Sequence, residues 1–349
     1  MNRGKNKKVL IIIGIFVFVF MSQDNLSAKP KAISYNPPLV DPDIYVDIYK
    51  PDLACKGTTL FSEYHNRQRP RIVEVNMRGE LLWEYVLPEN LIRYTNPGFD
   101  VEHLANNNVL FVLPLKGVYE IDRDGNIVWS YLTSKISHDA DRLTNGNTLI
   151  AWGGGDSKSD AQVREITPQK KVVWSWRAKD HFDKPPFSQI SRQGWTHTNS
   201  VSRLANGNTL ISLRNFDLVI EVDHKGEVIW SFDCKEFGQH PHEPEIEGNG
   251  NMLFTVHKRG WDPALEIDRE SGQVVWNFRM PEVDLVRDVD RLPNGNTLIV
   301  GRAEIVEVNP QGEVVWRLGV KGILEDKSPG KPKDDVSGYL YKAERIPQN

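Results

Sequence analysis

Four of the nine histidines in this chain stand at matching positions of a repeated segment. Each copy leads into a turn, Asn-Gly in most copies, and the residue seven places before the turn is His138 in one copy and His242 in another. Nine places before the turn, two copies carry His197 and His240. Offsets of seven and nine share parity along a strand, so these side chains are expected to point the same way, about 7 Å apart. In the remaining copies, offset seven is occupied by Phe99, Asn199, Arg287 and Tyr341.

Two arginines are expected to lie at the same end of the repeat. Arg214 and Arg302 stand six residues after the last residue of their turns, where the next strand has brought the chain back. If the copies surround one axis, three of them aim imidazoles at one mouth of a central channel. At least one guanidinium then lies beside the imidazoles.

Histidine together with arginine favours the chemistry of a tetrahedral anion. A neutral imidazole can attack as a nucleophile, while arginine and protonated histidine stabilise the oxygens of a group in transfer. The nearest acids, Asp139, Glu243 and Asp288, have the opposite parity, so we expect them to orient neighbours rather than to join the imidazoles. Sulfate or phosphate esters are the substrates that this pattern predicts, and no nucleotide-binding motif or cofactor motif accompanies it.

Two other interpretations of the cluster stay open. Three imidazoles could bind zinc or copper, which would indicate a metal-dependent hydrolase. Alternatively, the channel positions are polar only because the channel holds water. The protein would then be a non-catalytic module that binds a partner or an anionic ligand through its loops, and the longest loops are residues 152–162 and 181–194.

The elements that must position these residues are short strands in a sixfold repeat. Six segments end in an apolar pair followed by tryptophan: Trp83, Trp129, Trp174, Trp230, Trp276 and Trp316. Their spacings of 46, 45, 56, 46 and 40 residues suit one four-stranded propeller blade per copy. Each copy contains two glycine-bearing turns between apolar strands, so it is predicted to form two hairpins. The fold predicted is an all-β, six-bladed β-propeller whose tryptophans pack between blades.

The chain termini supply complementary parts of one blade. The last residues, 344–349, copy the innermost strand of the repeat and then stop, while residues 57–61 continue the pattern and residues 72–83 complete it. A blade shared between the two termini closes the ring and leaves no open sheet edge between first and last blades.

The composition and the N-terminal residues indicate the cellular location of the protein. Residues 1–28 have a basic start, an apolar run and a small residue at a cleavage point, which predicts a signal peptide with an uncleaved membrane anchor as the alternative. Residues 29–56 are expected to be an N-terminal extension, and residues 57–349 the propeller. A periplasmic or secreted location follows, in which Cys55 and Cys234 could pair or stay free. The net charge of −4 with dispersed basic residues argues against a nucleic-acid partner.

Together, the motifs resemble those of a known family. Residues 195–201, which contain His197 and Asn199, together with Arg214, His138 and His242, resemble the signature of the bacterial aryl sulfotransferases. The resemblance implies a periplasmic six-bladed propeller that moves a sulfuryl group from an aryl sulfate to a phenol without a nucleotide donor or cofactor.

The same resemblance implies roles for individual residues. His242 would be the nucleophile that becomes transiently sulfated, with His240 as the second candidate because the dipeptide Gln239-His240 also fits the family pattern. Arg214, His197 and His138 would hold the sulfuryl oxygens and assist proton transfer. The residues expected to line the substrate site are His240, Asn199, Arg287, Arg302, Phe99 and Tyr341.

Overall fold

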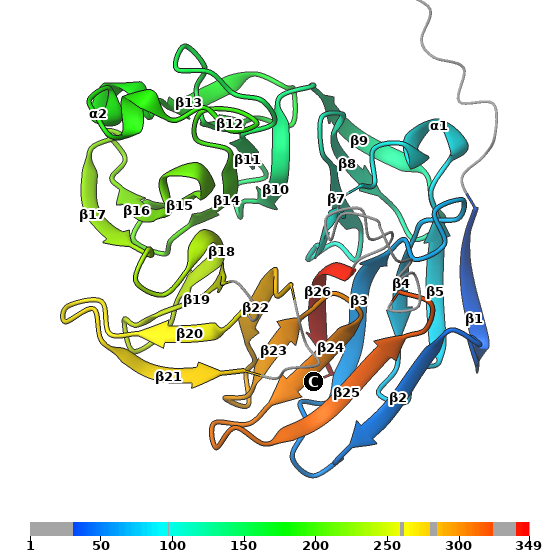
Figure 1. Cartoon of the computed structure of the whole chain (residues 1–349). Helices are drawn as coiled ribbons and strands as arrows, with labels where there is room; N and C mark the ends of the chain where they lie inside the picture. Colours follow the sequence, from blue (N-terminus) through cyan, green and yellow to red (C-terminus); the bar gives the residue numbers. More distant parts are fainter. Residues whose placement is uncertain (1–30, 97, 259–261, 280–284, 324–339, 349) are drawn as a thin grey trace, which may run out of the picture.

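Six antiparallel sheets stand around a common axis, and the chain visits them in order around the ring (Figure 1). The computed structural model describes residues 31–96, 98–258, 262–279, 285–323 and 340–348, so the expected signal peptide at residues 1–28 lies outside the described part. Within that part, no helix is long and apolar enough to cross a membrane. The predicted all-β, six-bladed propeller is confirmed.

Blades 2 to 5 each consist of four consecutive strands, which follow one another in chain order from the inside outwards. Blade 2 contains β6 (Asp100–His103), β7 (Val109–Leu113), β8 (Gly117–Ile121) and β9 (Ile127–Leu132). Blade 3 contains β10 (Ile136–Arg142), β11 (Thr148–Trp152), β12 (Val163–Ile166) and β13 (Val172–Trp176). Blade 4 contains β14 (Thr198–Arg203), β15 (Thr209–Leu213), β16 (Leu218–Val222) and β17 (Val228–Asp233). Blade 5 contains β18 (Gln239–Ile246), β19 (Met252–His257), β20 (Ala264–Ile267) and β21 (Val274–Phe278).

Blades 6 and 1 each have a fifth strand and meet at the closure of the ring. Blade 6 contains β22 (Asp288–Arg291), β23 (Thr297–Val300), β24 (Glu304–Val308), β25 (Val314–Val320) and, outermost, β2 (Ile44–Tyr49). Blade 1 contains β26 (Leu340–Pro347), β3 (Gly57–Glu63), β4 (Arg71–Val75), β5 (Leu81–Val86) and, outermost, β1 (Lys31–Leu39). Short helices occupy loops: α1 (Glu89–Ile92), α2 (Lys179–Phe182), and the 3-10 turns η1 (Phe187–Gln189) and η2 (Arg214–Phe216).

The blade sewn from both termini is confirmed. Strand β26 lies innermost and pairs antiparallel with β3, with Ala343 opposite Phe61 and Pro347 opposite Gly57. The close packing at this seam requires glycine, because a Cβ on Gly57 would come within 2.2 Å of the carbonyl oxygen of Ile346. The sheet therefore continues from the last strand of the chain into the first strand of the predicted propeller.

A three-residue joint links each blade to the next. In the joint between blades 2 and 3, Arg142 lies over the Trp129 ring at 4.8 Å and forms an ion pair with Glu120 at 2.8 Å. The Trp129 indole N–H also donates to the Pro168 carbonyl of blade 3, at 2.9 Å. The prediction that the tryptophans pack between blades is confirmed. The arginine–tryptophan pairs of the ring are Arg123–Trp83, Arg142–Trp129, Arg203–Trp174, Arg269–Trp230, Arg291–Trp276 and Arg345–Trp316.

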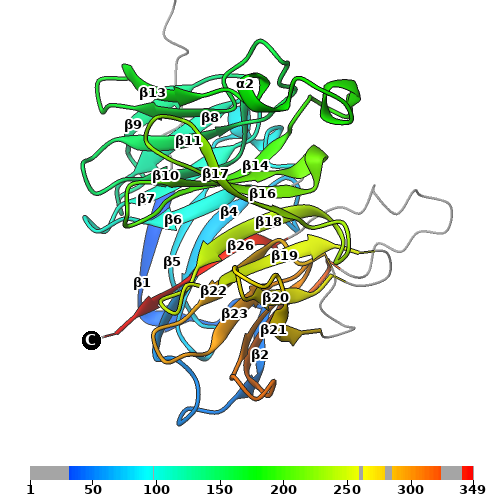
Figure 2. The ribbon, with the colours of Figure 1, turned by 90° about the vertical axis from the view of Figure 1, so that its left-hand side faces the viewer.

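Residues 29–56, expected as an extension, contribute strands β1 and β2 to the outer edges of two adjacent blades. Strand β1 pairs with β5 of blade 1 and β2 pairs with β25 of blade 6, so this N-terminal strap crosses the closing seam on the outside (Figures 1 and 2). Ile44 is buried in the apolar cluster between the two blades. The Tyr45 ring lies against Gly319, where a Cβ would come within 2.4 Å of it.

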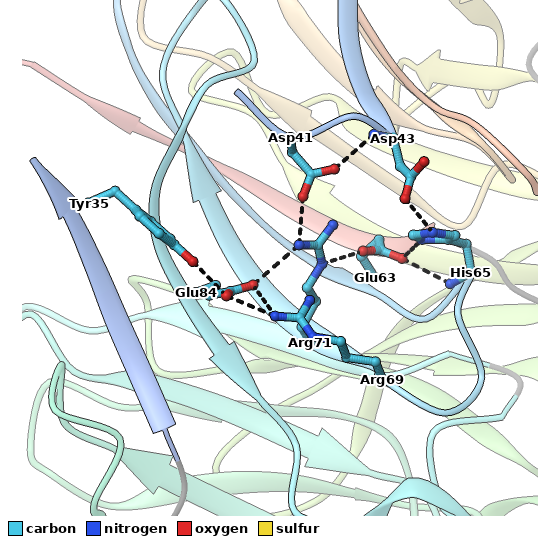
Figure 3. Close-up of polar contacts among 8 residues, drawn as sticks. All are labelled: Tyr35, Asp41, Asp43, Glu63, His65, Arg69, Arg71 and Glu84. Atoms are coloured by element: carbon cyan, nitrogen blue, oxygen red, sulfur yellow. Dashed lines mark hydrogen bonds and ion pairs between the residues drawn. The ribbon is translucent and has the colours of Figure 1, made fainter. Parts of the chain in front are cut away.

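A buried arginine fixes the strap to blade 1 (Figure 3). Arg71 donates to Asp41 of the strap at 2.8 Å, to Glu63 at 2.7 Å and to Glu84 at 3.2 Å. Glu84 also accepts a hydrogen bond from the Tyr35 hydroxyl of β1, at 2.7 Å. Since the side chains of Arg71, Glu63 and Glu84 are 5% exposed or less, these charges depend on each other for compensation.

A histidine completes this network at its outer end. His65 contacts Glu63 through its Nδ1 and lies 3.4 Å from Asp43 through its Nε2 (Figure 3). The hydrogen bond to Glu63 raises the pKa of His65, even though burial acts in the opposite direction. The strap is thus held by Arg71 and His65, which lie among carboxylates of the strap and of blade 1.

The two cysteines are free and buried. Cys55 lies in the apolar cluster between blades 6 and 1, and Cys234 in the cluster of blades 4 and 5. Of the two states that the sequence left open, the structure has the unpaired one.

We predict that Arg71→Met lowers the free energy of unfolding by about 3 kcal/mol or more, because it leaves buried carboxylates without their shared cation. The matched control is Arg177→Met, whose exposed ion pair with Asp180 should contribute about 0.5 kcal/mol or less. Urea denaturation of both variants measures the difference. Equal losses in the two variants would show that Arg71 does not hold the strap.

Candidate active site

Register shifts in the inner strands change the direction in which the predicted site residues point. The register shifts between Ile136 and Ala140 in β10 and between Thr198 and Val201 in β14. It shifts twice in β18, on either side of His242. Bulges of this kind turn side chains out of the regular alternation and are common beside functional sites. The rule that alternate residues of a strand point the same way therefore does not hold across the register shifts in these strands.

His138 and His197 meet across blades 3 and 4. Their Nε2 atoms lie 3.2 Å apart and their rings stack at a centroid distance of 5.4 Å. His197 Nδ1 lies 2.9 Å from the Gln193 carbonyl, which can only accept, so the Nδ1 of a neutral His197 carries the hydrogen. Then His138 Nε2 must donate to His197 Nε2, and the lone pair of His138 is on Nδ1. That nitrogen is buried and has no hydrogen-bond partner among the described residues.

Asp156, in the loop of residues 152–162, holds His197 in place. Its carboxylate accepts hydrogen bonds from the backbone N–H groups of Trp195, Thr196 and His197, each at 3.0 Å, and from the Thr196 hydroxyl at 2.8 Å. His197 has a φ of 47°, a left-handed conformation that is costly for a residue with a side chain. The carboxylate stabilises this backbone and sets the direction of the imidazole.

His242 lies in β18 with its ring buried beside Asn199. The Asn199 amide nitrogen lies 3.2 Å from His242 Nε2 and donates to the Pro241 carbonyl at 2.9 Å. His242 is 2% exposed. Burial, followed by the charges of His257 and other nearby cations, holds the pKa of His242 well below its ordinary value. The ring is therefore neutral at neutral pH and keeps a lone pair.

Arg214 and Arg287 supply positive charge to the imidazoles. Arg214, in η2, donates to the Asn215 side-chain carbonyl at 3.0 Å, and burial lowers its pKa. Arg287 lies over the Tyr341 ring at 5.3 Å, and that ring in turn stacks on His138 at 5.4 Å. After burial, both guanidinium groups contribute to the lowered pKa of His138. The structure thus brings these residues together, as the spacing predicted.

His240 lies at the edge of the same group. Its ring packs edge-on against His257 at 5.9 Å, and its backbone N–H donates to Asp217 at 2.9 Å. Burial, then the charge of Arg214, lowers its pKa to about 4. Its φ of 56° accompanies the register shift that separates it from His242.

One residue expected to line the site belongs to the packing between blades instead. Phe99 is fully buried in the apolar cluster of blades 1 and 2, where its ring packs edge-on against Phe111 at 6.4 Å. The backbone of Arg302 lies beside the closing strand, where its carbonyl accepts the Leu340 N–H at 2.8 Å. From blade 6, the charge of Arg287 acts on His138 and His242.

A second polar layer, in which the sequence pattern did not predict Lys342 and Asp100, lies one residue further along each inner strand. Lys342 of β26 lies 3.3 Å from Asp100, 3.7 Å from Asp139 and 3.5 Å from Glu243, which come from three other blades. Asp139 and Asp288 also accept backbone N–H groups of neighbouring blades, from Val201 and Ala343. The expectation that Asp139, Glu243 and Asp288 stay apart from the imidazoles and orient their neighbours agrees with these contacts. The sequence contains the pattern from which this layer could be recognised, because these residues all stand six places before the turn.

A third layer of acids lies two residues further on. Its members are Glu102, Asp141, Glu245, Asp290 and Glu344. Burial, then neighbouring carboxylates, raises the pKa of Glu102 to about 9 and that of Glu245 to about 7. A cavity of about 70 Å³ lies between this layer and Lys342, lined among others by Ser200 and Ser202. The axis therefore changes from cationic at the imidazole end to acidic at the other.

The arrangement suits a reaction of a bound anion. Buried neutral imidazoles offer nucleophilic and basic nitrogens, while Arg214 and Arg287 stabilise negative oxygens. Lys342 keeps carboxylates that would repel an anion in a separate layer. Among the described residues, no group of three or more His, Cys, Asp or Glu side chains converges as a metal site requires.

Comparisons with known proteins agree with this geometry. The arylsulfotransferase (ASST) family model matches residues 50–232, more than half of the chain. A second model, for the outer membrane protein assembly factor BamB, matches residues 159–323. No protein of curated function matches the chain significantly.

Solved structures of low sequence identity share the fold. A protein of unknown function from Bacteroides caccae is 20% identical, with a TM-score of 0.55 over 76% of this chain and 94% of that one. Virginiamycin B lyase from Staphylococcus aureus is 13% identical, with a TM-score of 0.50 over 82% of this chain and 87% of that one. At these identities the likeness concerns the propeller architecture alone.

We predict that Glu245→Gln flattens the dependence of stability on pH. The folded state holds a proton on Glu245 up to about pH 7, whereas the unfolded chain releases it near the ordinary value of 4.5, so stability is lost as pH rises between these values. The wild type should lose about 2 kcal/mol more than the variant between pH 5 and 8. Urea unfolding at several pH values measures this. Glu270→Gln, at an exposed turn, is the control; parallel curves for wild type and Glu245→Gln would contradict the prediction.

Proposed function

This chain belongs to the arylsulfotransferase family, and from that premise we propose that it transfers a sulfuryl group from an aryl sulfate ester to a phenolic acceptor through a sulfohistidine. Membership itself assigns a sulfotransferase type of enzyme; the intermediate and the substrates are the proposal. No nucleotide donor and no cofactor take part in it.

The observation that carries the proposal is the separation of two polar layers. His138 contacts His197, and the charges of His138 and Arg214 act on the ring of His242, while Asp139 and its acidic neighbours are held by Lys342 in a separate layer. A sulfate ester is an anion, and its transfer builds negative charge on oxygen. Preorganised guanidinium and imidazole groups stabilise that charge, whereas facing carboxylates would oppose it.

The first half of the reaction uses the lone pair of His242. The neutral ring forms a bond from nitrogen to sulfur as the bond from sulfur to the aryl oxygen breaks, and the phenolate leaves with that bonding pair. Asn199, beside His242 Nε2, and Arg214 are suited to bind the sulfuryl oxygens. Burial keeps the nucleophile unprotonated, which the attack requires.

The second half transfers the sulfuryl group to the acceptor. An acceptor phenol gives its proton to His138 Nδ1, the nitrogen that carries the lone pair, and its oxygen attacks sulfur. The bond from nitrogen to sulfur breaks and its electron pair returns to His242. His138 then gives the same proton to the phenolate that leaves in the next cycle, so the protons balance.

His242 suits the nucleophile better than His240. His242 is buried at 2% exposure and contacts Asn199, whereas His240 is half-buried at the edge of the group. The proposal also takes small aryl sulfates and phenols as the partners. It places the reaction in the periplasm or outside the cell, supported by the basic start and apolar run of residues 1–28.

We predict that His242→Ala reduces transfer from 4-nitrophenyl sulfate to a second phenol by about 1000-fold or more, because no other residue replaces the nucleophile. Arg214→Met should cost about 100-fold, since it removes one group that stabilises the transferring oxygens. The release of 4-nitrophenolate measures both. Mass spectrometry of wild type mixed with the ester should locate a sulfated residue in the peptide that contains His242.

The control is His224→Ala, an exposed histidine in the turn between β16 and β17 that should leave the rate unchanged. Sulfation at His240 would reassign the nucleophile within the same mechanism. Full activity of His242→Ala with no sulfated histidine in wild type would exclude a covalent intermediate altogether.

A further inference from the structure

His257 is a fifth histidine at the candidate site, and neither motif nor resemblance assigned it. It ends strand β19, where it pairs across the blade with Gln239. It stands six residues after Asn251, the last residue of its turn, which is the position that Arg214 occupies in blade 4. The repeat therefore delivers His257 to the mouth of the axis by the same geometry that delivers Arg214.

The ring of His257 lies directly against the ring of His242. Their centroids are 4.7 Å apart and the planes are tilted by 31°. His257 Nε2 and His242 Nδ1 are both buried and have no hydrogen-bond partner among the described residues. The contact is thus close enough for a charge on one ring to act on the other, without a hydrogen bond that would fix a shared proton.

Other charges around this pair are mainly positive. Arg214 from η2, Arg287 from the segment before β22 and His138 from β10 act on His242, and His240 lies next to His257. Glu243, the neighbour of His242 in sequence, turns to Lys342 instead. In such surroundings two touching imidazoles do not both hold a proton, so they titrate as a coupled pair.

Within this pair, the position of His257 at the end of β19 favours the charge on its ring. Burial holds the pKa of both imidazoles well below the ordinary value; the charge of His257 is the next cause for His242, whereas Arg287 and His240 follow burial for His257. The half-buried position of His257 also gives it more solvent than His242, which is 2% exposed. Both features favour a positive charge on His257 rather than on His242.

We propose that His257 is a positioning residue for the nucleophile: it lies against the ring of His242 and takes up the proton that would otherwise occupy that ring. The inference rests on the proposed sulfotransfer by His242. It extends that function by naming the group that keeps the lone pair available as the pH falls.

The test compares wild type with His257→Phe, which keeps a flat ring but removes the titratable nitrogens. Single-turnover release of 4-nitrophenolate from 4-nitrophenyl sulfate is followed between pH 4 and 8, and the pH titration of the His242 ring is followed by NMR of protein labelled at histidine. The variant should lose activity at higher pH than wild type, by about one pH unit, with the plateau rate retained. The pKa that the NMR titration gives for His242 should be higher in the variant by the same amount.

His257→Gln serves as the second variant if His257→Phe does not fold, and His103→Phe, a histidine of β6 outside the group, is the matched control that should leave both profiles unchanged. A lower plateau rate with an unmoved acid limb would show that His257 only packs, and unchanged profiles would show no role; either result overturns the inference. A wild type that never becomes sulfated would overturn the proposed function instead. The NMR titration would then still test whether His257 lowers the pKa of His242.

Discussion

The joint of glutamate, arginine and tryptophan between neighbouring blades is the interaction on which the rest of the structure depends. It recurs around the whole ring, and each copy fixes the third and fourth strands of one blade to the next blade. In the joint that closes the ring, Arg345 and Glu307 have no exposed side-chain surface, and Arg345 lies 4.5 Å from the Trp316 ring. Four of the arginines lie in the innermost strand of the next blade, whereas Arg123 and Arg269 stand in its outer turn. By holding each blade to its neighbour, the joints fix the inner strands side by side, and His138 of blade 3 can meet His197 of blade 4.

Much of the fold could be predicted from the sequence because the repeat is local and regular. The tryptophan strands, the Asn-Gly turns and the complementary termini each depend on a few neighbouring residues. The same regularity placed His138, His197, Arg214 and His242 together by counting from the turn. Counting failed where a residue belongs to the packing between blades, as Phe99 does. It also could not find Asp156, which holds His197 from a loop that has no counterpart in the repeat, nor the pairing of β1 and β2 with outer edges.

The site owes its chemistry to the separation of charge along the axis. Imidazoles buried beside guanidinium groups stay neutral, and an incoming anion meets donors without facing carboxylates. The carboxylates are nevertheless close, because each occupies the next position of the same inner strands. Lys342 compensates several of them at once, and their raised pKa values show that burial and mutual repulsion are only partly relieved. The closing strand thus supplies both the last joint of the ring and the cation that keeps the two layers apart.

The strap formed by β1 and β2 also decides which outer edges other polypeptides can reach. In the two blades that it covers, the apolar residue before the tryptophan is sheltered, as with fully buried Val315. In blades 2 to 5 the equivalent residues Val128, Val173, Ile229 and Val275 are 50% to 55% exposed. A free strand with apolar side chains is a template to which a foreign strand can add. Blades 6 and 1 lie on either side of the seam at which the two ends of the chain close the ring. Their outer edges are already paired with β2 and β1 and are not open to a foreign strand.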